Sequence, residues 1–117
     1  MTKDDCIFCK IVVGDIPSTK VYEDDRVLAF RDLNPMMPVH VLIVPKNHYD
    51  NIADGVAPED MVAVMDAVGT VAEAEGIKES GFRIVANTND DACQTVHHLH
   101  VHVLGGGKMN DGDPSLD

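Results

Sequence analysis

Four of the six histidines in this chain lie within one short segment, the sequence TVHHLHVHVL of residues 95–104. Three of them alternate with apolar residues: His98, His100 and His102. Successive side chains of a β-strand point to opposite faces of the sheet, so a strand here would place three imidazoles on one face and apolar side chains on the other. We expect the apolar face to pack on the core and the imidazoles to form a reactive surface.

Three imidazoles on a rigid strand could do two kinds of chemistry. Neutral imidazole is a common metal ligand, and alternating histidines on a strand can bind zinc through two or three rings. Alternatively, one ring can act as a nucleophile while its neighbours orient it or move protons. A polar strand face without a chemical role would be served equally well by Ser, Thr, Lys or Glu, so the concentration of histidine favours one of these two uses.

The residues around the histidines favour phosphate chemistry. Glycines 105–107 would let the backbone approach an anion closely, although a flexible exit from the strand would use glycine too. From residue 84 to residue 117 the only Lys or Arg is Lys108. A phosphate here would therefore be neutralised by imidazolium, backbone N–H groups and hydroxyls such as that of Thr95. With so few fixed cations, the site is expected to prefer a nucleotide with one phosphate over long polyphosphates.

A second candidate site is the pair Cys6 and Cys9 in the sequence CIFC. Such a lone pair occurs in zinc sites, in redox proteins and by chance. The thioredoxin-like βαβ context of a redox pair is missing, whereas the two further ligands that zinc needs could come from histidines. Three cysteines are an odd number and a poor disulfide framework, so a reducing cytoplasm fits best.

The rest of the sequence predicts the elements that position these residues. Apolar patterns and turn residues divide the chain into a short helix, two strands around an Asp-Asp turn, a third strand, a long helix and two further strands. The segments, in that order, are CIFCKIV, KVYEDDRVLAFRD, VHVLIVPK, residues 58–75, GFRIVAN and HLHVHVL. The loop between the last two strands is expected at residues 90–94.

The long helix has clear end signals and an apolar stripe. Pro58 suits its first turn, acidic residues there complement the helix dipole, and Gly76 suits its C-terminal stop. Four residues recur at helical spacing and are expected to face the core: Met61, Met65, Val68 and Ala72. Gly69 in the middle of the helix would allow close packing against another backbone.

Composition is that of one globular domain with an aliphatic core. Of the 117 residues 44% are apolar and only 4% aromatic, and the formal net charge is −11. This charge disfavours nucleic acid and anionic membranes as partners. No apolar run approaches the roughly 20 residues of a membrane span, and no signal peptide is evident. We expect a single domain over residues 1–109, followed by a polar tail over residues 110–117.

The segment HHLHVHVLGG resembles the signature of the histidine triad (HIT) family, His-x-His-x-His followed by apolar residues. Similar segments cover most of residues 6–109, namely CIFCKI, RVLAFRDLNP, HVLIVPKNH, FRIVAN and QTVHHLHVHVLGG. The ending LGGGKM resembles the Hint branch, the purine nucleoside phosphoramidases, more than the dinucleoside polyphosphate hydrolases. The resemblance implies an α+β fold, a five-stranded antiparallel sheet with one long and one short helix, whose subunits pair into a homodimer with a continuous sheet.

The resemblance also implies an enzyme mechanism. His100 would attack the α-phosphorus of a purine nucleoside 5′-monophosphoramidate, and water would release AMP or GMP from the nucleotidyl-histidine. His98 and His102 would complete the catalytic set, with His102 in contact with the phosphate. Two alternatives stay open: hydrolysis of dinucleoside polyphosphates or aminoacyl-adenylates, and a zinc-stabilised nucleotide-binding module that regulates a partner with little turnover.

Further positions carry over from the family pattern. Asp32 matches the acidic residue that accepts both ribose hydroxyls, Leu33 would lie against the base, and Gln94 with Thr95 would contact the phosphate and the leaving group. The full set of implied nucleotide contacts is Asp32, Leu33, His40, Asn87, Gln94, Thr95 and His102. By the same resemblance His48 and His98 would complete a structural Cys₂His₂ zinc site with Cys6 and Cys9, whereas strand alternation turns the other candidate, His97, to the opposite face.

Two residues depart from the family pattern. Asn89 stands where a glycine is usual, and Cys93 occupies the small-residue position before Gln94. The Cys93 thiol would lie near the phosphate and could make the enzyme sensitive to oxidation, unless it is merely a small residue that fits. These departures bear most on the preference for a leaving group.

Overall fold

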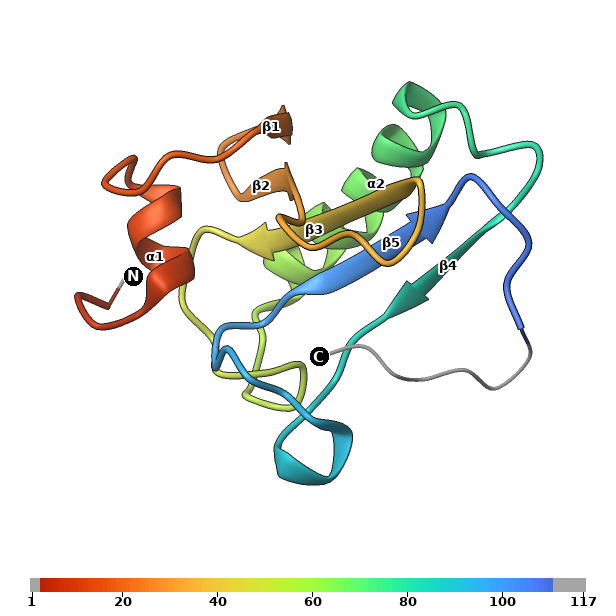
Figure 1. Ribbon diagram of the computed structural model, residues 1–117. Helices are drawn as coiled ribbons and strands as arrows, with labels where there is room; N and C mark the ends of the chain where they lie inside the picture. The colour runs from red at the N-terminus through yellow and green to blue at the C-terminus, as the bar shows by residue number, and fades with distance from the viewer. Residues whose placement is uncertain (1–2, 111–117) are drawn as a thin grey trace.

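The computed structural model describes residues 3–110 and contains one five-stranded antiparallel sheet with a helix on each face (Figure 1). The strand order is β1-β2-β3-β5-β4. The helices are α1 Ile7–Val12 and α2 Pro58–Ala74, with a 3₁₀ turn, η1, at Asp90–Ala92. The strands are β1 Lys20–Glu23, β2 Val27–Arg31, β3 Val39–Pro45, β4 Phe82–Val85 and β5 Val101–Gly105. The expected α+β fold and element order are confirmed.

Alternate residues of the central strands build two separate cores. On β2, Val27 and Ala29 face α2, whereas Leu28 and Phe30 face α1 and its flanking loop. The strands β2, β3 and β5 are therefore buried along nearly their whole length, because both faces of the sheet are covered. The second core, under α1, is the one that borders the histidines.

The face of α2 that meets the sheet differs from the expected one. The buried residues are Val64, Ala67, Val68, Val71 and Ala72, together with Asp60. Met65 is 41% exposed, so the prediction that it faces the core is wrong. The expected stripe and the buried one share Val68 and Ala72. The side that is buried is the one rich in small and β-branched residues. Gly69 is exposed with open space where a Cβ would point, so it does not serve close backbone packing.

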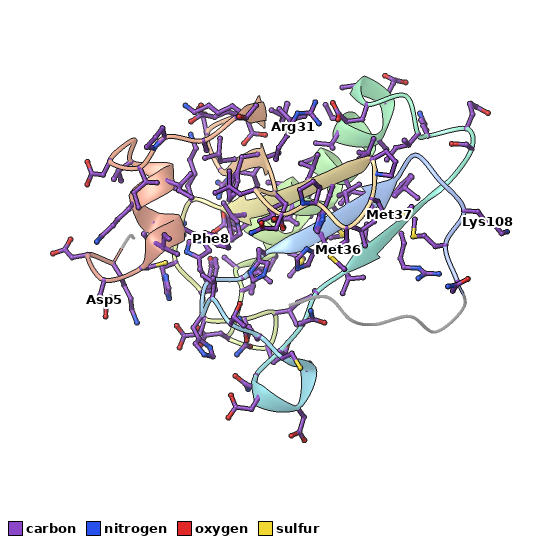
Figure 2. All side chains as sticks on the ribbon, viewed as in Figure 1. Asp5, Phe8, Arg31, Met36, Met37 and Lys108 are labelled. Atoms are coloured by element: carbon purple, nitrogen blue, oxygen red, sulfur yellow. The ribbon has the colours of Figure 1, made fainter. Side chains whose placement is uncertain are left out.

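The histidine segment is shorter as a strand than predicted, and its imidazoles are covered. Strand β5 begins at Val101, so of the three alternating histidines only His102 lies in the sheet. His98, His100 and His102 are all at most 5% exposed, and the Phe8 ring of α1 packs against His98 and His100 with ring centroids 6.1 and 5.1 Å away. Figure 2 shows Phe8 of α1 lying between this helix and the sheet. The expected open face of imidazoles is therefore a buried row beneath a helix.

Two further expectations concern a membrane span and the C-terminal tail. Among residues 3–110, no helix combines the length and the apolar character that a bilayer crossing requires. Apart from Asn110, the polar tail expected over residues 110–117 lies outside the part of the chain that the structure describes.

A buried carboxylate ties α2 to the loop that follows β3. Asp60 is 1% exposed and accepts hydrogen bonds from Arg26 at 2.9 Å, Asn47 at 3.0 Å and Tyr49 at 2.6 Å. The backbone carbonyl of Tyr49 in turn accepts the N–H of Leu99 at 2.7 Å. The carboxylate therefore fixes the segment on both sides of His48 and, through it, the start of the histidine segment.

We expect Asp60→Ala to lower the free energy of unfolding by about 3 kcal/mol at neutral pH, because three donors lose a charged acceptor. Burial alone would raise the pKa of this carboxyl, but the hydrogen bonds from Tyr49, Asn47 and Arg26 outweigh it and hold the pKa below its ordinary value. Its stabilising effect is thus complete above the unfolded pKa of about 3.9 and is lost as pH falls through the lower folded value.

Urea unfolding of the wild type and Asp60→Ala, at neutral pH and near pH 3, measures this difference. The gap between the two proteins should narrow in acid. Asp66→Ala, an exposed change on the same helix, serves as the control and should alter stability by less than about 0.5 kcal/mol. An equal gap at both pH values would contradict the assignment.

Candidate active site and metal centre

A cavity of about 240 Å³ opens beside the histidine row. Its apolar wall comes from α1, the loop after α1, β2 and β3, and includes Phe8, Ile11, Ile16, Phe30 and Leu42. Its polar lining includes Asp32, Thr95, His100 and His102. Apolar walls with a few converging polar groups are typical of small-molecule sites. A larger hollow of about 670 Å³, between the end of α2 and residues 106–109, is lined by none of the histidines.

His100 is held in one orientation and one tautomer. Its Nδ1 lies 2.7 Å from the carbonyl oxygen of His98, which can only accept, so Nδ1 carries the proton. In the neutral ring Nε2 then bears a lone pair. The edge-on ring of Phe8, with centroids 5.1 Å apart, packs against the imidazole. A buried, oriented imidazole with an unprotonated nitrogen at a cavity wall is suited to act as a nucleophile or a base.

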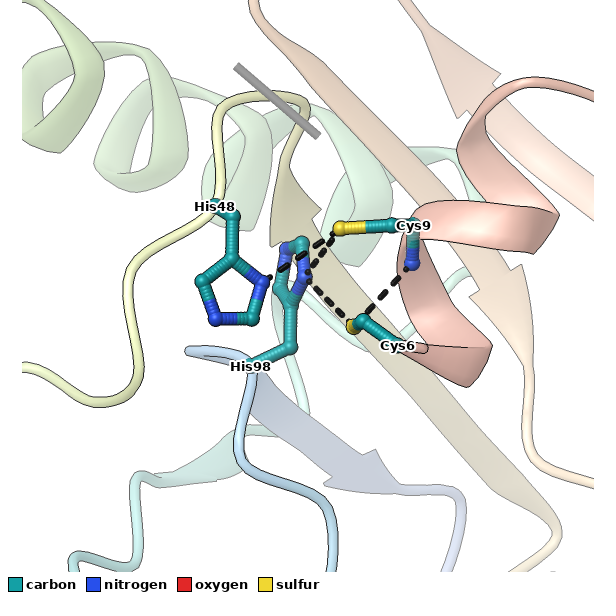
Figure 3. A group of neighbouring side chains, drawn as sticks. All are labelled: Cys6, Cys9, His48 and His98. Carbon is teal, nitrogen blue, oxygen red and sulfur yellow. Dashed lines mark hydrogen bonds between the residues drawn. The ribbon is translucent and has the colours of Figure 1, made fainter. Parts of the chain in front are cut away.

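The four predicted metal ligands converge although they come from three parts of the chain (Figure 3). Cys6 precedes α1 and Cys9 lies within it, His48 follows β3, and His98 precedes β5. All four ligand atoms lie within 4.8 Å of one another. The Cys6 and Cys9 sulfurs are 3.3 and 3.4 Å from Nδ1 of His98. Nδ1 of His48 is 3.3 Å from the Cys9 sulfur. Distances of this size are those between neighbouring ligands of one tetrahedral ion.

Hydrogen bonds outside this cluster turn both ring lone pairs inward. The Nε2–H of His98 donates to the carbonyl of Pro45 at 2.9 Å, and the Nε2–H of His48 donates to Asp50 at 2.8 Å. Each Nδ1 therefore faces the thiols unprotonated, as a metal ligand must. Burial lowers the pKa of His98 to about 4, which keeps the ring neutral. Burial also raises the pKa of the Cys9 thiol, whereas a bound divalent cation would favour the thiolate.

A second cluster, Asp32 with His40 and His102, does not have unprotonated ring nitrogens that all face one point. Its ligand atoms also lie within 4.8 Å of one another. However, the backbone N–H of Met36 donates to Nδ1 of His40 at 3.0 Å, so the proton of the neutral His40 ring is on Nε2, which points at the other two groups. A nitrogen that carries a hydrogen cannot bind a metal. The cluster of Cys6, Cys9, His48 and His98 is therefore suited to a cation, whereas Asp32, His40 and His102 form a set linked by hydrogen bonds.

The predicted nucleotide residues fall into two groups. The first group lines the cavity and comprises Asp32, Leu33, Thr95 and His102. His40 lies outside the lining, with its Nε2 3.4 Å from Oδ2 of Asp32 and 2.9 Å from Nδ1 of His102. The Gln94 side chain is buried and lines no part of this cavity. Its amide accepts the N–H of Asn89 at 2.8 Å and donates to the carbonyls of Asp50 and Val96 at 2.7 and 3.0 Å.

Asn87, two residues after β4, is half-buried and also lies outside the cavity lining. His97 is exposed, whereas its neighbour His98 is buried, and His97 lines a hollow with Cys6 and His48. The expectation that strand alternation turns His97 to the opposite face assumed a strand at this position, and β5 begins only at Val101.

Several groups in the site have no signal in the sequence. The carbonyls of Pro45 and His98 and the N–H of Met36 orient three imidazoles, but every residue carries such groups, so only the fold reveals their use. Phe8 and Asp50 could have been singled out, because one lies between the two cysteines and the other is two residues from His48.

Comparison with known proteins agrees with this geometry. The HIT domain model matches residues 13–109. The chain belongs to the HIT domain family. It is 46% identical over 115 residues to a 14 kDa zinc-binding protein of Brassica juncea, which covers 91% of this chain and 96% of the relative. It is 41% identical over 105 residues to the purine nucleoside phosphoramidase of Escherichia coli K12, which covers 88% of each.

Solved structures of HIT proteins have the same fold. A histidine triad protein from Clostridium difficile superimposes with a TM-score of 0.90 at 47% identity, covering 97% of this chain and 100% of that one. The antiparallel sheet with its two helices is therefore the HIT fold. The buried histidines lie in β5 and in the segment just before it.

The loop before the histidines contains two non-glycine residues at positive φ. Asn89 has φ 63° and ψ −169°, a region that is essentially reserved for glycine, and Cys93 has φ 60° and ψ 37° in the left-handed helical region. Both are the residues that the sequence resemblance singled out as departures. The backbone at Asn89 therefore has a glycine-like conformation although a side chain is present.

We expect Asn89→Gly to raise the melting temperature by a few degrees, since relief of about 1–3 kcal/mol of strain exceeds the entropy cost of glycine. Thr88→Gly is the matched control, because Thr88 has no positive φ and should only lose stability. Thermal unfolding followed by circular dichroism distinguishes the two. A fall of equal size in both variants would show that Asn89 is not strained.

Proposed function

We propose that this HIT protein is a hydrolase that cleaves the P–N bond of purine nucleoside 5′-monophosphoramidates and releases AMP or GMP. The observation that carries the proposal is the orientation of His100, whose Nδ1 is committed to a backbone carbonyl while the ring lines a cavity shared with Asp32 and His102. The similarity to a purine nucleoside phosphoramidase supports this substrate class.

The reaction proceeds in two displacements at phosphorus. The Nε2 lone pair of His100 attacks the α-phosphorus, the P–N bond breaks, and the amine leaves with a proton from the site. Water then attacks the nucleotidyl-histidine, the phosphorus–imidazole bond breaks, and the nucleoside monophosphate leaves with the oxygen from water. Splitting one displacement into two gives each step an accessible nucleophile.

The cavity supports binding of a nucleoside monophosphate. Its apolar walls accept the flat base, with Leu33 against it, and the Asp32 carboxylate accepts the ribose hydroxyls. Thr95 and His102 donate hydrogen bonds to phosphate oxygens. Gln94 acts through the backbone shape of its loop, and we place Asn87 beside the nucleophile on family resemblance alone. Among residues 84–110 the only Lys or Arg is Lys108, which favours ligands of low phosphate charge.

We propose that Cys6, Cys9, His48 and His98 hold one structural zinc ion. The inward lone pairs and the ligand spacing support zinc, as does the similarity to a zinc-binding protein. When bound, the ion would supply cross-linking between α1 and the histidine segment and no reactive group. His98 would then serve the catalytic set as an anchor for His100 and not as a proton carrier.

We also propose a cytoplasmic homodimer in which the sheet continues from one subunit to the next. Strand β4 is an edge of the sheet, and its Phe82 and Ile84 are 37% and 44% exposed. An open edge with apolar side chains is suited to pairing with a second copy. The net charge of −11 speaks against nucleic acid and anionic membranes as partners.

We expect His100→Ala to abolish AMP release from adenosine 5′-monophosphate joined to a small amine, with at least a ~10⁴-fold loss, while AMP still binds within about threefold of the wild-type affinity. His97→Ala, an exposed histidine outside the site, is the control and should keep wild-type turnover. Turnover by neither the wild type nor the variant, with AMP binding intact, would instead identify a nucleotide-binding module.

We expect one zinc ion per chain, and Cys6→Ser should lose it together with at least about 10 °C of melting temperature. A chelator should lower the melting temperature before it abolishes turnover, because the ion is structural. Elemental analysis and thermal unfolding test this, with the exposed Cys93→Ser as the matched control. Equal zinc content in Cys6→Ser and the wild type would refute the assignment.

A further inference from the structure

His40 and His102 meet because of the register of the sheet. Strands β3 and β5 are antiparallel, with Leu42 opposite His102 and His40 opposite Leu104, so the two histidines are diagonal neighbours on the same face. Their ring centroids lie 5.1 Å apart, and both side chains are buried. The contact is therefore part of the sheet and does not depend on a mobile loop.

The hydrogen bond between the two rings has a fixed direction. The N–H of Met36 can only donate, so Nδ1 of His40 accepts and its Nε2 carries the proton. This Nε2–H lies 2.9 Å from Nδ1 of His102 and donates to it. A neutral His102 with an accepting Nδ1 has its own proton on Nε2. A single backbone N–H thus sets the tautomers of two imidazoles in succession.

The His40 proton has a second, more distant acceptor. Oδ2 of Asp32 lies 3.4 Å from Nε2 of His40, and the other oxygen of this carboxylate accepts the N–H of Asn34 at 2.8 Å. The same hydrogen is therefore pulled toward His102 and, more weakly, toward Asp32. Whatever donates to Asp32 reduces the second pull and commits the hydrogen to His102.

From this geometry we infer that His40 is a positioning residue that holds His102 in the Nε2–H tautomer and couples ribose binding at Asp32 to phosphate stabilisation at His102. The inference rests on the proposed function, because it assigns the ribose to Asp32 and the phosphate to His102. Ribose hydroxyls that donate to Asp32 strengthen the bond from His40 to His102. The ribose then contributes to the rate of the chemical step as well as to affinity.

The direction of the tautomer matters for the reaction. With its proton on Nε2, His102 presents a donor to phosphoryl oxygens, whose negative charge needs donors as the nucleophile approaches. The opposite tautomer would present a lone pair to the same oxygens and repel them. Loss of His40 should therefore lower kcat and change KM little, because the interaction matters most in the transition state.

Two substitutions of His40 separate this role from packing. His40→Gln keeps a side-chain N–H that can donate to His102, whereas His40→Leu fills the space without a donor. Two-bond ¹H–¹⁵N spectra of the AMP complex report which nitrogen of His102 carries the proton. The wild type and His40→Gln should show the Nε2–H form, and His40→Leu should show both forms.

Kinetics with two substrates test the coupling. We compare adenosine 5′-monophosphate joined to a small amine with its 2′,3′-dideoxy analogue. In the wild type the analogue should lower kcat about tenfold, whereas in His40→Leu it should lower kcat less than about twofold. On the ribose substrate His40→Leu should lose at least about tenfold in kcat with KM within about threefold, and His40→Gln should recover most of the loss.

A wild-type spectrum with the His102 proton on Nδ1 would overturn the inference, even if His40→Leu failed to fold. So would an equal effect of the dideoxy analogue on kcat in wild type and His40→Leu. Absence of hydrolysis by the wild type would overturn the proposed function instead, and the tautomer spectrum of the AMP complex would still test the hydrogen-bond chain.

Discussion

The organisation of this site depends on backbone groups that can play only one part in a hydrogen bond. The carbonyls of Pro45 and His98 can only accept, and the N–H of Met36 can only donate. Because each of them meets one ring nitrogen, each determines what the other nitrogen of that ring can do. Three imidazoles of similar intrinsic chemistry thereby present different groups to their surroundings: an Nδ1 lone pair to the thiols, an Nε2 lone pair on a ring that lines the cavity, and an Nε2–H to His102.

The second determinant is helix α1, which is only six residues long but packs against His98 and His100. It contributes Phe8 to the wall around His100 and Cys9 to the ligand cluster, and Cys6 caps its N-terminus by accepting the N–H of Cys9 at 3.3 Å. So short a helix is not stable by itself. Its packing on the sheet, and the four-residue cluster that fastens it there, keep the imidazoles out of water.

The sequence predicted the order of the elements, whereas its choice of site residues stays a prediction. The Asp-Asp turn, Pro45, Pro58 and Gly76 mark element ends, because each restricts the backbone locally, and all of them lie where expected. Burial was harder to predict. The stripe through Met61 and Met65 had the right period, but which of two overlapping stripes meets the sheet depends on how closely a helix can approach, which is a property of the assembled layers.

At the site, too, local patterns were predictable from the sequence and tertiary packing was not. Strand alternation placed three imidazoles together, and the resemblance to HIT proteins supplied candidate partners for Cys6 and Cys9, which the structure brings within ligand distance. Neither could show that α1 covers the histidines, because that is tertiary packing. Neither could show that the Gln94 amide is used up by backbone groups of its own loop and of the loop after β3, because every residue carries such groups.

His98 touches both halves of the site through different chemical groups. Its ring belongs to the ligand cluster, whereas the group that orients His100 is its backbone carbonyl, which any amino acid would provide. The identity of the side chain at this position is therefore separable from the orientation of His100, provided that the chain keeps its path. In a HIT protein, the four residues of the cluster could therefore be replaced by well-packed apolar side chains while the hydrogen bond that orients His100 is kept.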